Sequence, residues 1–208
     1  MQRINNLFSR VYKKQSPRQP YVLGLSGSPR IQGNSEILLD KALSGAVSSG
    51  ARIEKIRIND CKFIACQDCE NVRNDGYCSI NDQFQKIYQA IQKADIIFLS
   101  SPIYFGSLTA QTKMLIDRFQ CHWRAVNQFK TLPQEVKKQG YFLSIQAEAR
   151  DVFFTNAALI VRNFFATAGI KYCGELFCPG VEEKGMISQY PDKLNQAFVL
   201  GENLYCRI

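Results

Sequence analysis

The feature that most constrains this sequence is a loop of small polar residues between an apolar run and a helical pattern. The apolar run covers Tyr21 to Leu25, and the helical pattern begins near Ser35. The first amides of a helix have no intrahelical acceptor, and the helix dipole adds partial positive charge there. Gly27 and Gly33 let the backbone turn and approach a ligand closely. The order of strand, loop and helix therefore predicts an anion site at the start of the helix.

The loop lacks the signatures of two common nucleotide sites. A Walker loop needs a lysine before its final serine or threonine, and Asn34 and Ser35 stand at those positions. The Gly-x-Gly-x-x-Gly pattern of dinucleotide sites is also absent. A hydroxyl-rich loop without the lysine suits one terminal phosphate, such as that of flavin mononucleotide (FMN). The residues expected to contact it are Ser26, Ser28, Arg30, Asn34 and Ser35. The simpler alternative is an ordinary turn with a capping serine.

Composition places the chain among globular proteins with a basic character. Its 208 residues fit one domain, and no apolar run is long enough to cross a membrane. Residues 1–20 contain basic side chains, no acid and no apolar signal core, so we interpret them as a solvated extension of a domain over 21–208 and expect a cytoplasmic protein. A nucleic-acid or membrane-surface role for the extension is the alternative.

The net charge of +8 favours anionic ligands, but no basic and aromatic interleaving appears, so we expect neither a nucleic-acid nor a membrane partner.

Strand and helix patterns alternate along the chain. The strand-like runs are 21–25, 52–58, 95–100, 141–145 and 172–177. The helical patterns are 35–49, 81–93, 108–121, 152–168 and 191–204. This alternation predicts an α/β fold, a doubly wound five-stranded parallel sheet in the order 2-1-3-4-5 with helices on both faces. The mixed second run is typical of an edge strand, and the apolar third run of a central one. Ligands of such sheets bind at the carboxyl ends of the strands, between the first and third.

The loop after the third expected strand has the character of a site for a flat ring. Pro102 fixes the backbone, Tyr104 and Phe105 offer apolar faces, and Gly106 permits close approach. Backbone amides of such a loop are placed to bond the edge of a flavin. The expected ring contacts are Pro102, Ile103, Tyr104, Phe105 and Gly106. The alternative is that the aromatic side chains pack into the core or into a subunit contact.

Four motifs together resemble the NAD(P)H-dependent FMN reductase family of the flavodoxin-like superfamily. They are Gly27-Ser28-Pro29-Arg30, Gly33-Asn34-Ser35, Ser101-Pro102-Ile103-Tyr104, and Lys113 followed by Asp117-Arg118. The resemblance implies a flavodoxin-like fold, bound FMN, NAD(P)H as electron donor, and a homodimer or homotetramer. We interpret the charges of the last motif as structural or interfacial, and we expect no catalytic acid or base. In many relatives the loop after the fourth strand also touches the ring. Here it reads Gln146-Ala147-Glu148, and its contact stays open.

Cysteines at 60–79 make the chain most similar to the iron-sulfur flavoprotein branch of this family. That branch holds a [4Fe-4S] cluster with a Cys-x2-Cys-x2-Cys run and a fourth cysteine several residues on. Cys66, Cys69 and Cys78 fit three of the positions, and Val72 occupies the third position of the run. Cys61 is the expected substitute, so the expected metal ligands are Cys61, Cys66, Cys69 and Cys78. Four thiolates suit a cubane cluster or a tetrahedral zinc ion. Free thiols that shape the site are the third alternative.

Two functions follow from these patterns. The first is an FMN-dependent oxidoreductase that passes electrons from NAD(P)H to a quinone, a flavin or another small acceptor. The second is an iron-sulfur flavoprotein that relays electrons between a ferredoxin-like donor and FMN. A flavin-binding regulatory protein with a basic arm is a third reading. His122, the only histidine, is expected to pack rather than to react.

Overall fold

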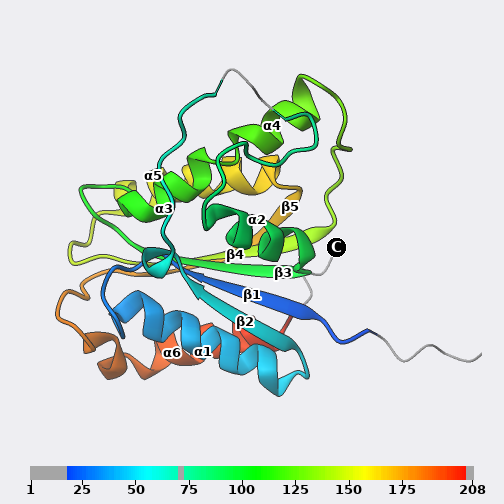
Figure 1. The fold of residues 1–208 in the computed structure, drawn as a ribbon. Helices are drawn as coiled ribbons and strands as arrows, with labels where there is room; N and C mark the ends of the chain where they lie inside the picture. The colour runs from blue at the N-terminus through cyan, green and yellow to red at the C-terminus, as the bar shows by residue number, and fades with distance from the viewer. Residues whose placement is uncertain (1–17, 70–72, 205–208) are drawn as a thin grey trace, which may run out of the picture.

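A computed structural model describes residues 18–69 and 73–204. The expected basic extension at 1–20 therefore lies almost wholly outside the described residues. Within them, five parallel strands form one sheet in the order β2-β1-β3-β4-β5 (Figure 1). The strands are β1 (Tyr21–Ser26), β2 (Arg52–Arg57), β3 (Ile96–Pro102), β4 (Lys138–Ile145) and β5 (Ile170–Cys178). The order predicted from the alternation of strands and helices is confirmed.

Helices cover both faces of the sheet, as Figure 1 shows. Helices α1 (Asn34–Ser48) and α6 (Pro191–Glu202) lie side by side on one face. The other face carries α2 (Phe84–Lys93), α3 (Ala110–Asp117), α4 (Gln120–Asn127) and α5 (Asp151–Thr167). Two short 3₁₀ helices, η2 (Ile58–Asp60) and η3 (Met186–Gln189), follow β2 and precede α6. None of the described helices combines the length and the apolar character that crossing a bilayer requires.

The expected single helix over 108–121 is wrong, because the chain forms two helices there. The turn between α3 and α4 contains Arg118 and Phe119, which are 1% and 2% exposed. The amide of Phe119 donates to the carbonyl of Ile116, an i to i−3 bond that tightens the end of α3. The break lets both side chains enter the interior, where Phe119 contacts Phe84 edge to face.

The burial of the strands agrees with their positions in the sheet. Every residue of β1 is buried, and so are the first six residues of β3, because helices cover these central strands on both faces. Strand β2 has exposed residues at three of its six positions and lies at an edge, as its mixed sequence predicts. Ser26 pairs in register with Ser100, and Pro102 with Ile145. The carboxyl ends of β1, β3 and β4 therefore meet at one edge of the sheet.

Candidate functional site

The two loops expected to hold a ligand line one cleft at this edge, with a volume of about 220 Å³. The first loop contributes Ser28, Arg30, Gly33, Asn34 and Ser35. The second loop contributes Pro102, Ile103 and Tyr104. Ser26, Phe105 and Gly106, which the sequence also suggested, do not line this cleft. The fold thus brings together residues about 70 positions apart, as expected for a parallel sheet whose order reverses between β1 and β3.

The first loop curls back so that the start of α1 faces the cleft. The amide of Gly27 donates to the carbonyl of Ser100 at 2.7 Å, which ties the loop to β3. The Ser28 hydroxyl accepts the amide of Arg30 at 3.2 Å, and this bond closes the bend. Gly33 precedes the first helical residue and supplies no side-chain cap. The first amides of α1 are therefore free of a competing side-chain acceptor at the point where an anion is best stabilised.

Ser26 is fully buried at the end of β1, and its Oγ atom has no hydrogen-bond partner among the described residues. A buried polar atom without a partner costs about 1–3 kcal/mol, so such atoms are rare away from ligands. Its position directly before the loop fits a role in binding a phosphate. Hydroxyls, free helix amides and a cleft at the switch point together fit the phosphate and ring of FMN.

Asn34 has a different environment from the one expected. Its Nδ2 atom donates to the carbonyl of Glu183 at 2.8 Å, and its Oδ1 atom accepts the amide of Ile187 at 3.3 Å. Both polar ends of the side chain are thus bonded to the segment that follows β5. Asn34 holds this segment against the cleft, which no local sequence pattern signals because the partners are about 150 residues away.

The second loop is a tight turn closed by two backbone bonds between Tyr104 and Ser107, at 2.8 and 3.1 Å. Both central residues have positive φ, 50° at Phe105 and 73° at Gly106. A positive φ is strained for a bulky side chain, and such strain is found mainly at functional sites. The turn directs the Phe105 ring into solvent, where it is fully exposed. Tyr104 lines the cleft from the same turn.

The loop after β4, whose contact the sequence left open, does line the cleft through Gln146 and Ala147. Gln146 is 4% exposed, and its Nε2 atom donates to the carbonyl of Arg150 at 3.0 Å. Its Oε1 atom has no partner within the described part of the chain. This acceptor is placed to bond an N–H group of a ligand. The shared edge of parallel strands could have pointed to it, because β4 ends beside β3.

The buried carboxylate of Glu36 anchors the first loop through a hydrogen bond. Glu36, in the first turn of α1, is 3% exposed and accepts the amide of Gln32 at 2.8 Å. Its carboxylate also lies 3.1 Å from the Nζ atom of Lys55 and 3.2 Å from the Nε atom of Arg57. The two cations offset its negative charge, so the loop gains a fixed anchor without repelling an anion in the cleft.

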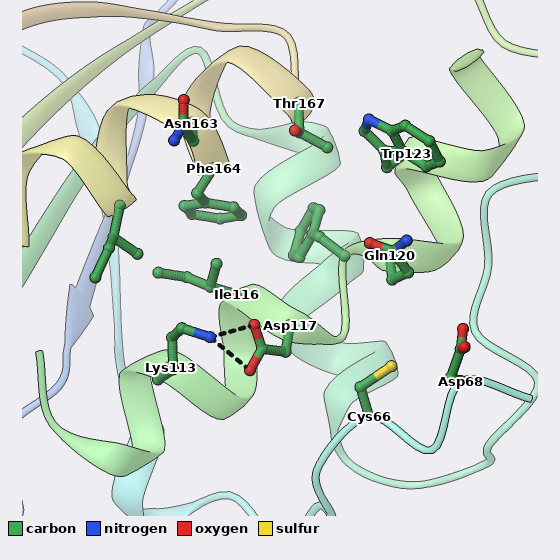
Figure 2. Close-up of a pocket in the computed structure, with 12 residues that line it drawn as sticks. Cys66, Asp68, Lys113, Ile116, Asp117, Gln120, Trp123, Asn163, Phe164 and Thr167 are labelled. Atoms are coloured by element: carbon green, nitrogen blue, oxygen red, sulfur yellow. Dashed lines mark hydrogen bonds and ion pairs between the residues drawn. The ribbon is translucent and has the colours of Figure 1, made fainter. Parts of the chain in front are cut away.

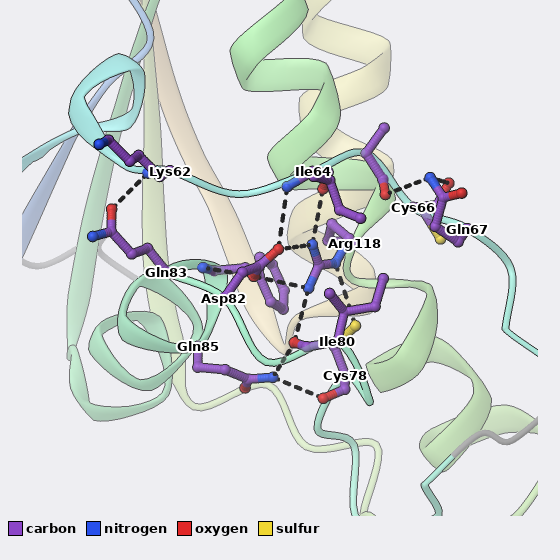
Figure 3. Close-up of polar contacts among 12 residues, drawn as sticks. Lys62, Ile64, Cys66, Gln67, Cys78, Ile80, Asp82, Gln83, Gln85 and Arg118 are labelled. Atoms are coloured by element: carbon purple, nitrogen blue, oxygen red, sulfur yellow. Dashed lines mark hydrogen bonds and ion pairs between the residues drawn. The ribbon is translucent and has the colours of Figure 1, made fainter.

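A second constellation surrounds Arg118, whose side chain is fully buried (Figure 3). The guanidinium donates to the carbonyl of Ile64 at 2.8 Å, to both carboxylate oxygens of Asp82, and to the Sγ atom of Cys78 at 3.3 Å. Burial opposes ionisation of Asp82, but hydrogen bonds from Arg118 and from two backbone amides lower the pKa of this carboxyl. The expectation that Arg118 is a structural charge is confirmed, because it fixes both ends of the cysteine segment.

The cysteines of that segment divide between two environments. Cys66, Cys69 and Cys78 line a small cavity of about 30 Å³. Cys61 does not line it, and its Sγ atom donates to the carbonyl of Arg57 at 3.6 Å. Val72 lies outside the described residues. As the side chains stand, no three histidine, cysteine or carboxylate groups in the described segments lie close enough for one metal ion.

A larger groove of about 570 Å³ runs between α3, α4 and α5 (Figure 2). Lys113 and Asp117 form an exposed ion pair of 2.7 Å along it, and Trp123 lies further along its wall. Cys66 and Asp68 border both this groove and the cysteine cavity. None of the residues that line the cleft at the carboxyl edge of the sheet also lines this groove, so the groove and that cleft are separate.

Comparisons with known proteins find similar flavoproteins among the curated sequences. An iron-sulfur flavoprotein of Methanocaldococcus jannaschii is 40% identical over 97 residues, 47% of this chain and 50% of that protein. One from Methanosarcina thermophila is 34% identical over 97 residues, 47% of this chain and 51% of that protein. The match thus spans about half the length of these curated relatives.

Similarity at the level of structure and family extends further along the chain. The solved NAD(P)H:quinone oxidoreductase from Methanothermobacter marburgensis has a TM-score of 0.69 at 15% identity, and the match covers 90% of this chain and 100% of that one. This likeness shows the flavodoxin-like fold. The family model described as NADPH-dependent FMN reductase matches residues 20–170. The chain therefore belongs to the NADPH-dependent FMN reductase family, whose cofactor is FMN.

Proposed function

We propose that the protein is an FMN-dependent oxidoreductase that passes electrons from NAD(P)H to a second, small acceptor such as a quinone or a flavin. The observation that carries this proposal is the cleft at the carboxyl edge of the sheet, which both ligand loops line. FMN, when bound, supplies the redox chemistry, and the protein supplies binding, orientation and electrostatics. A flavin reaction of this kind needs no catalytic acid or base from the protein.

The residues of the cleft divide the work of holding FMN. Ser28, Ser35 and the first amides of α1 are placed to bind the phosphate, and Arg30 adds a positive charge at the rim. Pro102, Ile103 and Tyr104 offer an apolar wall for the ring. By resemblance to the family, we also propose a homodimer or homotetramer.

The test is flavin binding by matched serine variants. The double variant Ser28→Ala and Ser35→Ala removes two hydroxyls from the cleft, whereas Ser44→Ala removes an exposed hydroxyl from the same helix. We expect the double variant to bind FMN at least about a hundredfold more weakly, because each of the two lost bonds to a charged group contributes about 1.5–3 kcal/mol. Ser44→Ala should bind FMN like the wild type. Equal affinity in all three proteins would contradict the phosphate assignment. Anaerobic bleaching of the flavin by NADH or NADPH then identifies the donor.

A second candidate function is an electron relay between a ferredoxin-like donor and FMN through a 4Fe-4S cluster. Its support is that Cys66, Cys69 and Cys78 line one cavity, together with the names of the curated relatives. The net charge of +8 favours docking of an acidic donor. Iron and sulfide analysis of anaerobically purified protein tests it. Less than about one iron atom per chain would exclude the relay, since a cubane cluster needs several.

A further inference from the structure

Gln146 is the first residue after β4, and hydrogen bonds fix its backbone on both sides. Its amide donates to the carbonyl of Cys178 at 3.2 Å, and its carbonyl accepts the amide of Val181 at 3.0 Å. The preceding residue, Ile145, accepts the amide of Ile103 at 2.9 Å. Gln146 is therefore held beside the loop that offers an apolar wall for the flavin ring.

The side-chain amide of Gln146 has its orientation set by Arg150. Its Nε2 atom donates to the carbonyl of Arg150 at 3.0 Å. A carbonyl oxygen accepts hydrogen bonds and donates none, so the donor end of the amide has to face Arg150 and the Oε1 end has to face away from it. The Oε1 atom is buried and has no partner among residues 18–69 and 73–204. A buried acceptor in this state is unfavourable, so we expect the ligand of the cleft to supply the donor.

FMN offers few donors to such an acceptor. The ring carbonyls are acceptors, and the oxidised ring has a single N–H group, at N3. The other donors are the hydroxyls of the ribityl chain, which joins the phosphate to the ring. In the sheet, β3 separates β4 from β1, and the loop after β1 is the one proposed to bind the phosphate. Gln146 thus lies on the side of the cleft away from the phosphate loop, which favours the ring N–H over the ribityl hydroxyls.

We propose that Gln146 is a specificity-determining residue for the flavin and that its Oε1 atom accepts a hydrogen bond from N3–H of the ring. This inference rests on the proposed function, because it takes FMN as the occupant of the cleft. The N3 atom keeps its hydrogen when the ring is reduced, so this bond stabilises the oxidised and the reduced flavin alike. Gln146 therefore selects which flavin binds and has little effect on its reduction potential.

The first experiment changes the flavin and leaves the protein intact. The probes are FMN and 3-methyl-FMN, in which a methyl group replaces the hydrogen on N3. Fluorescence titration measures the affinity of the wild-type chain for each. We expect 3-methyl-FMN to bind at least about tenfold more weakly, because the methyl group removes the donor and leaves the Oε1 atom of Gln146 without a partner. No residue is substituted in this comparison, so a folding defect cannot produce the difference.

Two variants then assign this discrimination to one residue. Gln146→Leu removes the acceptor, and Gln120→Leu changes an exposed glutamine of the separate groove between α3, α4 and α5. We expect Gln146→Leu to bind FMN about tenfold more weakly than the wild type and to bind 3-methyl-FMN about as well as FMN. Gln120→Leu should discriminate between the two flavins as the wild type does. Redox titration of bound FMN should give similar reduction potentials for the wild type and Gln146→Leu.

Three results would overturn the inference while leaving the proposed function in place. Equal affinity of the wild type for the two flavins would show that Oε1 does not face N3–H. Undiminished discrimination in Gln146→Leu would assign the contact to another group. Normal binding of oxidised FMN by Gln146→Leu with weaker binding of reduced FMN would place the acceptor at N5, which carries a hydrogen only in the reduced ring. Wild-type protein that binds neither flavin would instead reject the proposed function itself, and the role of Gln146 with it.

Discussion

The Nη1 atom of Arg118 lies 2.8 Å from the Oδ2 atom of Asp82 across a gap of 36 residues. The arginine side chain is fully buried, and that of Asp82 is 16% exposed (Figure 3). The Arg118 guanidinium also lies over the ring of Phe84, 4.6 Å from its centroid. A charge in this position is stable only with its partners in place. The pair therefore couples the end of α3 to the segment that carries the cysteines.

Replacing Arg118 with alanine should be strongly destabilising. It leaves the Asp82 carboxylate without its cation and removes the Arg118 donor from the carbonyl of Ile64, and breaking such a pair costs about 3–5 kcal/mol. Lys113→Ala is the matched control, because Lys113 belongs to an exposed pair on α3, the helix that Arg118 directly follows, and such a pair contributes about 0.3–0.5 kcal/mol. Urea denaturation measures both free energies of unfolding. Similar small losses in the two variants would contradict the structural role of Arg118.

Gly27→Ala should disturb the first loop, because a Cβ atom at Gly27 would lie 2.0 Å from the Oγ1 atom of Thr112 and 3.0 Å from the carbonyl oxygen of Ser100. Overpacking of this kind costs about 1–3 kcal/mol, and the shifted loop should also bind FMN more weakly. Gly174→Ala is the control, since its Cβ would meet only Tyr141, at 3.4 Å. Thermal unfolding and flavin titration measure the two effects. A Gly27→Ala protein with wild-type stability and wild-type flavin affinity would show that the loop has room for a Cβ atom at this position.

Ser26→Ala should have opposite effects on the free and the flavin-bound protein. The Oγ atom of Ser26 is buried without a partner in the described chain, so removing it should raise the stability of the apoprotein by up to about 1 kcal/mol. If the hydroxyl binds the phosphate, FMN affinity should fall by about tenfold. Chemical denaturation of the apoprotein and fluorescence titration with FMN test the two halves separately. An unchanged dissociation constant would remove Ser26 from the phosphate site.

His122 should make the protein less stable in mild acid. Burial, and then the charge of Lys138, lower the pKa of His122 from its usual value of 6.5. The unfolded chain therefore binds this proton more readily than the folded one, so stability is complete above pH 6.5 and falls as the pH drops below it. The slope should not exceed about 1.4 kcal/mol per pH unit.

Denaturation curves of the wild type and of His122→Gln between about pH 7 and pH 5 test this expectation. The variant should show a flatter dependence on pH. A wild-type curve that is no steeper than that of the variant would show that His122 is not buried in its neutral form. Tyr88, whose hydroxyl lies 2.8 Å from the Nδ1 atom of His122, supplies the packing partner that the sequence alone could not name.

Local patterns were enough to predict the fold and the cleft. The run at 95–100 reads as a covered strand because every one of its residues except Asp95 is apolar or small, and β3 is buried accordingly. The first loop could be located because glycine, hydroxyls and a helix start follow one another within eleven residues. The strand order follows from the handedness and short connections of parallel units, which leave few alternatives. The strand pattern and the first loop are formed by residues that are close in sequence, so both can be predicted from the sequence alone.

Contacts between distant segments were decided by the tertiary structure alone. The sequence suggested Asn34 as a phosphate ligand, and the structure adds that this cleft residue also bonds the segment after β5 through both of its polar atoms. It suggested Cys61 beside the other cysteines, but the break after α3 brings Cys121 to their cavity instead. Periodicity determines which residues form a strand or a helix, because it acts over a few residues. Which side chains contact one another between those elements depends on how the helices pack against the sheet, and this packing is determined only in the folded chain.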